Sequence, residues 1–400
     1  MLRHLLKLTW KRKSRNLLLS MEILLAFVIV FAIAATAVRY WQLYHAPLGF
    51  RYDDVWAIQL QPPNEDHSAR AEGVHLRMVQ ALQAMPEVES AALTNFALFQ
   101  SARMTSHFSA PGGKQGVRAS MLQCGDQFWS TLGMQLLAGR WPSEQDNGSA
   151  ALPAVLNRKM ADALFPGRSP LGQEVVSESH DPKDTQRFRV VGLIEDFRSE
   201  GEFMTPQPFI LFRHTELPEN RMRMAILAKV RPGTPRAFEA TLQRQLKQVR
   251  NDWSYQVNPE SELRASQMVL QLVPLKILAV IGAFLLAMVA FGLFGVLWQN
   301  TTRRIPEIGL RRAMGATAGS IYRQIVGEQL LLSSLAMLGG LVLLVQLPLT
   351  GALGDSLDWR VFGAAAALSM AVIYLLSLLC SLYPGWRASR LHPAAALHYE

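Results

Sequence analysis

Four long apolar runs constrain this chain more than any other feature. They lie at residues 17–38, 277–298, 330–347 and 361–382, and each approaches the roughly 20 residues that a helix needs to cross a bilayer core. Residues 39–276, which have the mixed composition of a soluble domain, separate the first run from the second. The sequence therefore predicts four membrane spans and one large extramembrane domain, an architecture that excludes most cytosolic enzymes.

The first run also has the basic flank of a secretory signal peptide. Its apolar stretch is longer than the roughly 7–15 residues typical of such peptides, and no small-residue cleavage site follows. Arg39, Tyr40 and Trp41 come next instead. We therefore interpret residues 17–38 as a retained span.

The distribution of Lys and Arg predicts the orientation, because these residues stay on the cytoplasmic side of span ends. Residues 1–16 and the loop 299–329 are rich in them, whereas the link 348–360 holds two aspartates and only Arg360. We expect both termini and residues 299–329 inside the cell, and residues 39–276 and 348–360 outside.

This bias explains much of the net charge of +9, and no nucleic-acid-binding motif accompanies it. Cys124 and Cys380 are too far apart in this topology to form a disulfide.

The extramembrane region predicts an α+β domain in two parts. Short apolar runs indicate strands at 55–60, 88–93, 208–212 and 224–230, and helical spacing indicates helices at 69–85 and 235–249. Residues 121–198 have their own short strands, a helix at 158–165, and a polar stretch at 172–187 that is a loop or a hairpin. We expect one split domain with an inserted second subdomain.

No catalytic or metal-binding motif appears in this domain. Its histidines lack HExxH or HxxH spacing, and no G-x-S-x-G elbow occurs. The acid pairs Asp53–Asp54 and Glu195–Asp196 are better explained as solvated turns than as a general acid and base. The sequence therefore predicts a binding or force-transmitting module without a metal or a cofactor.

The loop 299–329 carries the most specific pattern, RRIPEIGLRRAMGA at residues 303–316. Pro306 suits the first turn of a helix, and Glu307 favours its positive N-terminal end. Arg311 and Arg312 favour the negative C-terminal end, and Gly315 would end the helix. A short basic amphipathic helix is predicted, and one interpretation is that it only anchors on anionic lipid.

The sequence of this segment resembles that of the inter-span loop in FtsX-like and MacB-like ABC transporter permeases, the type VII family. There the loop holds a coupling helix that sits in a groove of the ATPase. The resemblance assigns the ATPase contact to Glu307, Ile308, Gly309, Arg311, Arg312, Ala313 and Gly315. The tail 384–400 is similar to the family's closing motif, and residues 128–140, 155–165, 170–172 and 190–196 are similar to the MacB-type periplasmic core domain.

This resemblance implies a membrane α-helical fold of four helices plus an α+β domain, built from a split porter-like subdomain and an inserted one. It implies a bacterial inner membrane protein with both termini inside. MacB carries a nucleotide-binding domain ahead of its first span, whereas here only residues 1–16 precede the span and no G-x-x-x-x-G-K-[ST] occurs. We therefore expect no enzyme activity on this chain. ATP and Mg²⁺ are expected on a separate ATPase dimer, with a second permease chain beside this one.

The spans carry almost no polar residue near their middle, so the resemblance implies that substrate does not cross the bilayer through them. Glu22 has two interpretations, an interfacial acid paired with Lys13 or Arg15, which we favour, and an interhelical contact. Residues 39–45 and 262–275 could extend two spans outward as a stalk, and its predicted residues are Arg39, Tyr40, Glu262 and Arg264.

Two functions follow from this architecture. One is export or extraction of a peptide, antibiotic or lipid-like substrate from the outer face, with a periplasmic adaptor, an outer-membrane duct and membrane lipids as further partners. The alternative is a non-transporting signalling complex that regulates a periplasmic partner.

Overall fold

The computed structural model describes residues 13–63, 73–101, 103–113, 116–178, 185–213, 224–351 and 357–390. The chain divides into two compact units, a helical unit of Met1–Gln42 with Leu272–Glu400 and an α/β unit of Leu43–Gln271. Most of the predicted N-terminal segment 1–16 and the last ten residues of the tail motif lie outside the described residues.

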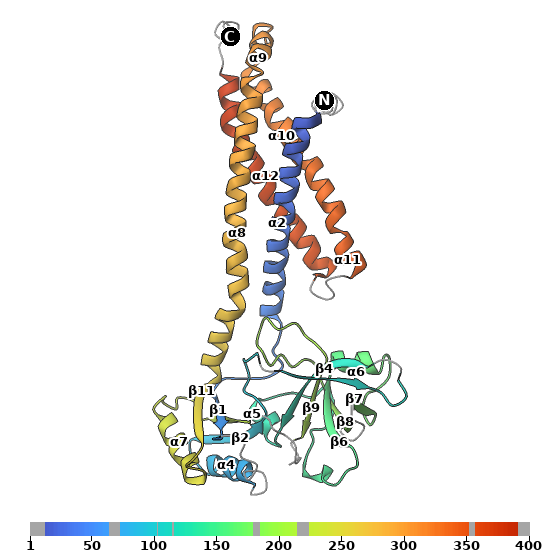
Figure 1. The fold of residues 1–400 in the computed structure, drawn as a ribbon, viewed down its shortest axis with the longest axis vertical. Helices are drawn as coiled ribbons and strands as arrows, with labels where there is room; N and C mark the ends of the chain where they lie inside the picture. The colour runs from blue at the N-terminus through green and yellow to red at the C-terminus, as the bar shows by residue number, and fades with distance from the viewer. Residues whose placement is uncertain are drawn as a thin grey trace. The chain divides into compact units, whose positions relative to one another are not determined.

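Four long helices form the helical unit: α2 (Lys13–His45), α8 (Glu260–Thr302, whose first turns belong to the α/β unit), α10 (Ala318–Leu344) and α12 (Trp359–Ser389) (Figure 1). Within the described residues these four are long and apolar enough to span a membrane. The short helices α9 (Ile305–Ala313) and α11 (Gln346–Thr350) precede and follow α10. The four apolar helices that the sequence predicts are thus confirmed.

The long helices share one hydrophobic cluster, in which Phe27 of α2 packs with residues of α8, α10 and α12. Hydroxyl pairs also join α10 to α12, with Ser333 and Ser377 at 2.8 Å. The carboxylate of Glu22 of α2 lies against Gly292 of α8, where an added Cβ would collide with it, so the interhelical contact is present. The side chains of Lys13 and Arg15, the partners of the favoured interpretation, lie outside the described residues.

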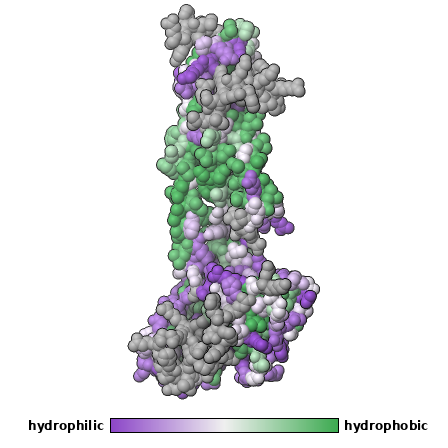
Figure 2. All heavy atoms as spheres, turned by 45° about the vertical axis from the view of Figure 1, so that its right-hand side comes forward, coloured by the Kyte–Doolittle hydropathy of each residue, from purple (hydrophilic) through white to green (hydrophobic). Residues whose placement is uncertain are grey.

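Helix α8 is the least covered of the four. Only 11% of its apolar window is buried, against 33–39% in the other three helices. Figure 2 shows apolar side chains gathered over the middle of the helical unit and polar ones toward the end that holds α9. The exposed face of α8 is therefore available to lipid or to another chain.

The α/β unit is built on an 11-stranded sheet of order β11-β1-β10-β2-β4-β3-β7-β8-β6-β9, with β5 paired to β8. The strands are β1 (Val55–Gln61), β2 (Val88–Thr94), β3 (Met104–Ser109), β4 (Val117–Cys124), β5 (Ala138–Gly139), β6 (Leu152–Asn157), β7 (Glu174–Glu178), β8 (Arg187–Ile194), β9 (Phe209–Arg213), β10 (Ala225–Val230) and β11 (Ser254–Pro259). The helices are α4 (Val74–Gln83), α5 (Phe128–Thr131), α6 (Arg158–Leu164) and α7 (Phe238–Val249), with a 3₁₀ turn η1 (Glu144–Asp146).

Strands β11-β1-β10-β2 with helices α4 and α7 form the split βαβ arrangement, which matches the predicted split subdomain. Helices α4 and α7 cover one face of these strands (Figure 1). Along β1, Trp56 and Ile58 point to that face, while Val55 and Ala57 point to a second core, as the two-residue period of a strand requires. The predicted elements of this half are present, except that residues 69–72 of the expected 69–85 helix lie outside the described ranges.

The inserted subdomain extends farther than the expected 121–198. Strand β3 pairs with β4 and β7, and β9 pairs with β4 in parallel and with β6. Strands β3 and β9 join the insertion through these pairings. The pairings of β3 with β7 and of β9 with β4 and β6 connect residues far apart in sequence, which local patterns cannot show. Strand β7 pairs antiparallel with β8, which agrees with the hairpin, one of the two structures predicted for residues 172–187. The two halves of the sheet meet at a single residue pair, Thr94 and Cys124.

Candidate functional site

Helix α9 occupies the place of the predicted coupling helix. It has Pro306 in its first turn, Glu307 near its N-terminus, and Arg311 and Arg312 in its last turn. Gly315 has φ +96°, a left-handed conformation that favours glycine, and the helix ends just before it. The local signals in the sequence therefore located this helix to within a residue or two.

One face of α9 is buried. Ile308 is 6% exposed and packs with Ile321 and Ile325 of α10 and with Ala388 of α12. Gly309 is buried as well. Burying an isoleucine side chain contributes roughly 1.5–3 kcal/mol, so these residues hold the helix in place. Ile308 and Gly309 therefore lie on the buried side of α9 and not on its exposed surface.

A hydrogen-bonded network ties α9 to α10. Arg311 Nη2 donates to Glu307 Oε1 at 2.6 Å, and its Nη1 donates to Gln324 Oε1 at 2.7 Å. Gln324 in turn donates to Glu328 at 2.9 Å, and Arg304 Nη1 lies 2.5 Å from the other Glu328 oxygen. Arg304 and Glu328 are less than one-fifth exposed, so water weakens this ion pair less than a surface one.

The outward face of α9 carries an apolar pair that the sequence-based assignment missed. Leu310 is 54% exposed and Met314 is 72% exposed, and the spacing of four residues puts both on one side of the helix. Glu307 and Ala313 are also exposed. The sequence contained a signal for this pair, because helical spacing places Leu310 and Met314 on the side of the helix opposite Ile308. Exposed apolar side chains beside a charge form a surface that a protein partner can cover.

The predicted stalk residues lie on two continuous helices. Arg39 and Tyr40 are on α2, which runs on to His45. Glu262 and Arg264 are on α8, which runs without interruption from Glu260 to Thr302. Glu262 forms an ion pair of 3.3 Å with Arg236, and the Arg264 guanidinium lies 5.1 Å from the Tyr52 ring centre.

Arg198, a residue that the sequence did not single out, organises the end of the α/β unit where α2 enters. Its side chain is fully buried and donates to five backbone carbonyls, those of Leu43, Ala46, Pro47, Glu202 and Met204. The distances to the Leu43 and Ala46 oxygens are 2.8 Å. A cation at the C-terminal end of a helix is favoured by the helix dipole, and the carbonyls replace the water that burial removes.

Residues 198–204, which we call the junction segment, also contact α8. Glu202 forms a part-buried ion pair with Arg264, and Gln271 Nε2 donates to the Glu200 carbonyl at 3.2 Å. Within the α/β unit, the end of α2 and the first turns of α8 are therefore held by the same segment. The Glu202 side chain is nearly buried, so solvent weakens its ion pair with Arg264 less than it weakens an exposed pair.

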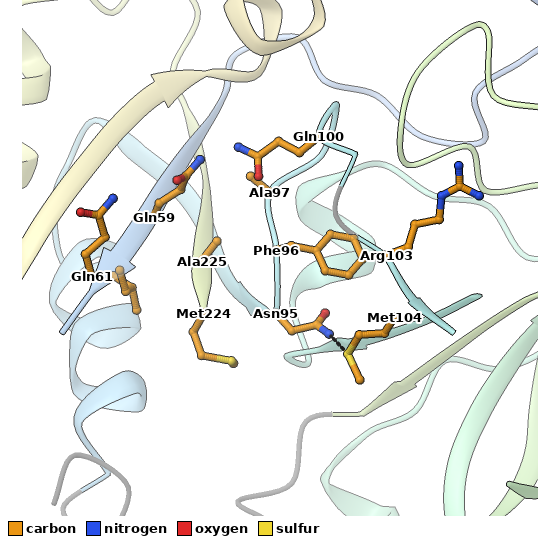
Figure 3. A pocket seen from close by; sticks show the side chains of 11 residues that line it. Gln59, Gln61, Asn95, Phe96, Ala97, Gln100, Arg103, Met104, Met224 and Ala225 are labelled. Atoms are coloured by element: carbon orange, nitrogen blue, oxygen red, sulfur yellow. Dashed lines mark hydrogen bonds between the residues drawn. The ribbon is translucent and has the colours of Figure 1, made fainter. Parts of the chain in front are cut away.

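A cavity of about 250 Å³ lies between the strands of the split subdomain and the start of β3 (Figure 3). Its lining combines amides, among them Gln59 and Gln100, with Phe96 and Met104. The Arg103 charge at its edge is paired with Glu200. The cavity therefore offers amide hydrogen bonds and apolar contact without a nucleophile or a carboxylate. Within the described residues, no group of three or more His, Cys, Asp or Glu side chains converges as a metal site requires.

Comparison with known proteins gives matches over most of the chain. Residues 23–245 match the family model of the MacB-like periplasmic core domain, and residues 279–393 match that of the FtsX-like permease C-terminal region. A macrolide export ATP-binding/permease protein MacB of Bdellovibrio bacteriovorus is 26% identical over 291 residues, which are 66% of this chain and 41% of that protein. The pyoverdine export protein PvdT of Pseudomonas putida is 27% identical over 276 residues, 66% of this chain and 40% of its own length.

An ABC transporter permease YknZ of Bacillus subtilis, described as uncharacterized, is 24% identical over 298 residues, 69% of this chain and 68% of its own. Among solved structures, the periplasmic region of MacB from Actinobacillus actinomycetemcomitans covers 56% of this chain and 97% of its own, with 16% identity and a TM-score of 0.39. The chain thus spans about two-fifths of the length of the MacB and PvdT relatives it matches.

Proposed function

The chain belongs to the FtsX-like permeases that carry a MacB-like periplasmic core domain, and from this premise we propose that it transmits ATP-driven movement to its α/β unit and so drives export. The observation that carries the proposal is the placement of α9, which is locked onto α10 through Arg311 and Arg304 while it presents Leu310 and Met314 outward. Relatives named for the export of macrolides and pyoverdine support the direction of transport.

In this proposal the ATPase is a separate subunit dimer that covers the exposed face of α9. Leu310 and Met314 supply apolar contact, while Glu307, Arg312 and Ala313 surround them. Ile308 and Gly309 act indirectly by positioning this face. ATP and Mg²⁺ belong to the ATPase, and a second permease chain, identical or related, completes the pair that an ATPase dimer requires.

The proposed topology places α9 in the cytoplasm of a bacterial cell and the α/β unit outside the inner membrane. Both termini are then inside, in accordance with the Lys and Arg distribution. The substrate is a peptide, an antibiotic or a lipid-like molecule taken from the outer face, with an adaptor and an outer-membrane duct as partners. The junction segment supports a lever, because it fastens the ends of both α2 and α8 within the α/β unit.

The double variant Leu310→Glu/Met314→Glu tests the ATPase contact. A hot-spot residue of an interface costs more than about 1 kcal/mol when it is removed, so with Leu310 and Met314 as the hot spots we expect at least about a tenfold loss of ATPase recovered with the purified permease. The matched control is Leu76→Glu/Leu137→Glu, which places two glutamates at exposed apolar positions of the α/β unit. Equal recovery with both double variants would overturn the assignment of α9.

Cysteine labelling tests the topology separately. Both native cysteines are buried, and burial holds the pKa of the Cys124 thiol well above its ordinary value, so neither gives much background. In a chain with both replaced, Asn147→Cys should react with a membrane-impermeant maleimide from outside, and Arg323→Cys, an exposed position away from the proposed ATPase contact, should react only after the inner membrane is opened. The reverse pattern would contradict the proposed orientation.

A further inference from the structure

The surface where α8 and α12 end together carries a stack of aromatic rings. The rings of Trp298 and Tyr383 are 5.8 Å apart and nearly parallel, with an interplanar angle of 7°. Phe294 and Trp386 continue the stack on either side, at 6.2 Å from Trp298 and 6.3 Å from Tyr383. Two helices therefore contribute to one aromatic surface.

Arg387, in the last turn of α12, and Arg390, the residue after α12, cover this surface. The Arg387 guanidinium carbon lies 4.4 Å from the Trp298 ring centre, and that of Arg390 lies 4.6 Å from the Trp386 ring centre. The spacing of three residues puts both on one side of the helix end. We call these four rings and two guanidinium groups the arginine–aromatic stack.

Stacking of this kind occupies the flat face of a guanidinium and leaves its N–H edges free to donate. In the described part of the chain, neither Arg387 nor Arg390 forms an ion pair with a carboxylate, and both are exposed. The N–H edges of guanidinium groups suit the oxygens of a phosphate, which arginine binds through paired hydrogen bonds. The stack thus offers a positioned cationic site with no anion supplied by the described residues.

The stack adjoins the apolar surface of the helical unit. Trp386 is 48% exposed and Tyr383 is 51% exposed, and Leu379 and Leu382, on the preceding turn of α12, are exposed as well. Phe291, which is 78% exposed, continues this surface along α8. A ligand that fits must carry its phosphate beside long apolar chains. That combination describes a membrane phospholipid and not a free phosphate or a soluble acidic peptide.

We propose that the arginine–aromatic stack is a binding site for an anionic phospholipid, with the headgroup phosphate between Arg387 and Arg390 and the acyl chains along α8 and α12. The rings of Trp298 and Trp386 position the two cations, so the site differs from the general attraction of basic residues to a charged membrane surface. Binding of the lipid depends on this geometry and not on the ATPase partner.

The test uses the purified full chain in detergent, with phosphatidylglycerol or phosphatidylcholine added, and bound lipid counted by native mass spectrometry. A cationic side chain at an anionic lipid surface is worth about a fivefold change in affinity, so two predict a preference of about 25-fold for phosphatidylglycerol. Arg387→Gln/Arg390→Gln should abolish this preference. The matched control Arg303→Gln/Arg323→Gln removes the same charge from two other exposed arginines and should keep it within about twofold.

Two further arms complete the experiment. Arg387→Lys/Arg390→Lys keeps the charge but loses the planar donors, and should lose most of the preference while folding normally. Inorganic phosphate in millimolar excess should not displace the lipid. Equal losses in the Gln variant and its control, full retention in the Lys variant, or displacement by phosphate would each overturn the proposal.

Discussion

Helix α9 and the junction segment sit at the two ends of the proposed transmission route, and they are built in opposite ways. Helix α9 keeps one face open, with Leu310 and Met314 exposed and its ion pair of Glu307 and Arg311 partly in water. The junction segment buries Arg198 completely and satisfies it with backbone carbonyls. An exposed apolar face can be covered and released by a partner, whereas a buried cation with five acceptors resists rearrangement. The comparison indicates a replaceable contact at one end and a fixed joint at the other.

Breaking the fixed joint should have the largest functional effect. Insertion of two glycines after Arg264 displaces the following turns of α8 from the junction segment and costs about 1 kcal/mol per glycine in helix stability. In the wild type we expect a non-hydrolysable ATP analogue to change hydrogen exchange of residues 198–204 at least about fivefold, a coupling of about 1 kcal/mol. The variant should lose this response while the assembled complex still hydrolyses ATP.

The control for that experiment is a two-glycine insertion after Gly148, where a left-handed turn has open space around it. This variant should keep the response. A normal response in the Arg264 insertion would rule out the lever and favour a binding role for the α/β unit.

The burial of Arg198 predicts a large loss of stability on substitution. Arg198→Met leaves several buried carbonyls without a donor, and we expect a loss of about 3–5 kcal/mol in the free energy of unfolding of the α/β unit. Arg158→Met removes an ion pair whose two side chains are both about half exposed, and it should cost less than about 1 kcal/mol. Chemical denaturation of the full chain in detergent, followed by tryptophan fluorescence, measures both. Similar losses in the two variants would mean that the junction is not a special joint.

The two faces of α9 should separate stability from binding. Ile308→Ala removes packing against α10 and α12 and should cost about 2–4 kcal/mol locally, seen as faster hydrogen exchange of residues 305–313. Leu310→Ala should change that exchange by less than about 0.5 kcal/mol, as expected for a surface substitution, but should weaken ATPase recovery. If Leu310→Ala destabilised the helix as much as Ile308→Ala, the exposed face would not be the docking surface.

The smallest effect is expected for the ion pair on α9. Glu307→Gln breaks a pair at spacing i,i+4 whose side chains are 45% and 35% exposed. Such pairs contribute about 0.3–0.5 kcal/mol, so helix stability should barely change by the same exchange measurement. A loss above about 1 kcal/mol would show that Glu307, through its network with Gln324 and Glu328, stabilises α9 more than an exposed ion pair does.

The sequence predicted the elements whose signals are local. Membrane spans appear as long apolar runs, and α9 appears through Pro306, Glu307 and Gly315. Most strands of the split subdomain appear as short apolar runs, because both faces of strands such as β1 are buried against a core. Strand β3 escaped prediction because only Phe108 among its residues is fully buried, and its partners β4 and β7 are fixed by the rest of the sheet.

The same distinction between local signals and tertiary contacts applies to the candidate sites. The sequence by itself determined the four apolar spans, most strands and helices of the α/β domain and the short helix α9, because each depends on residues close together in the chain. Only the tertiary structure decided that Ile308 faces inward while Leu310 faces out, that Glu22 contacts Gly292, and that Arg198 joins Leu43 to residues 199–204. Leu43 and Arg198 are 155 positions apart in the chain, and Glu22 and Gly292 are 270 apart. Which side chain is buried at such a contact depends on packing between elements, which no local pattern records.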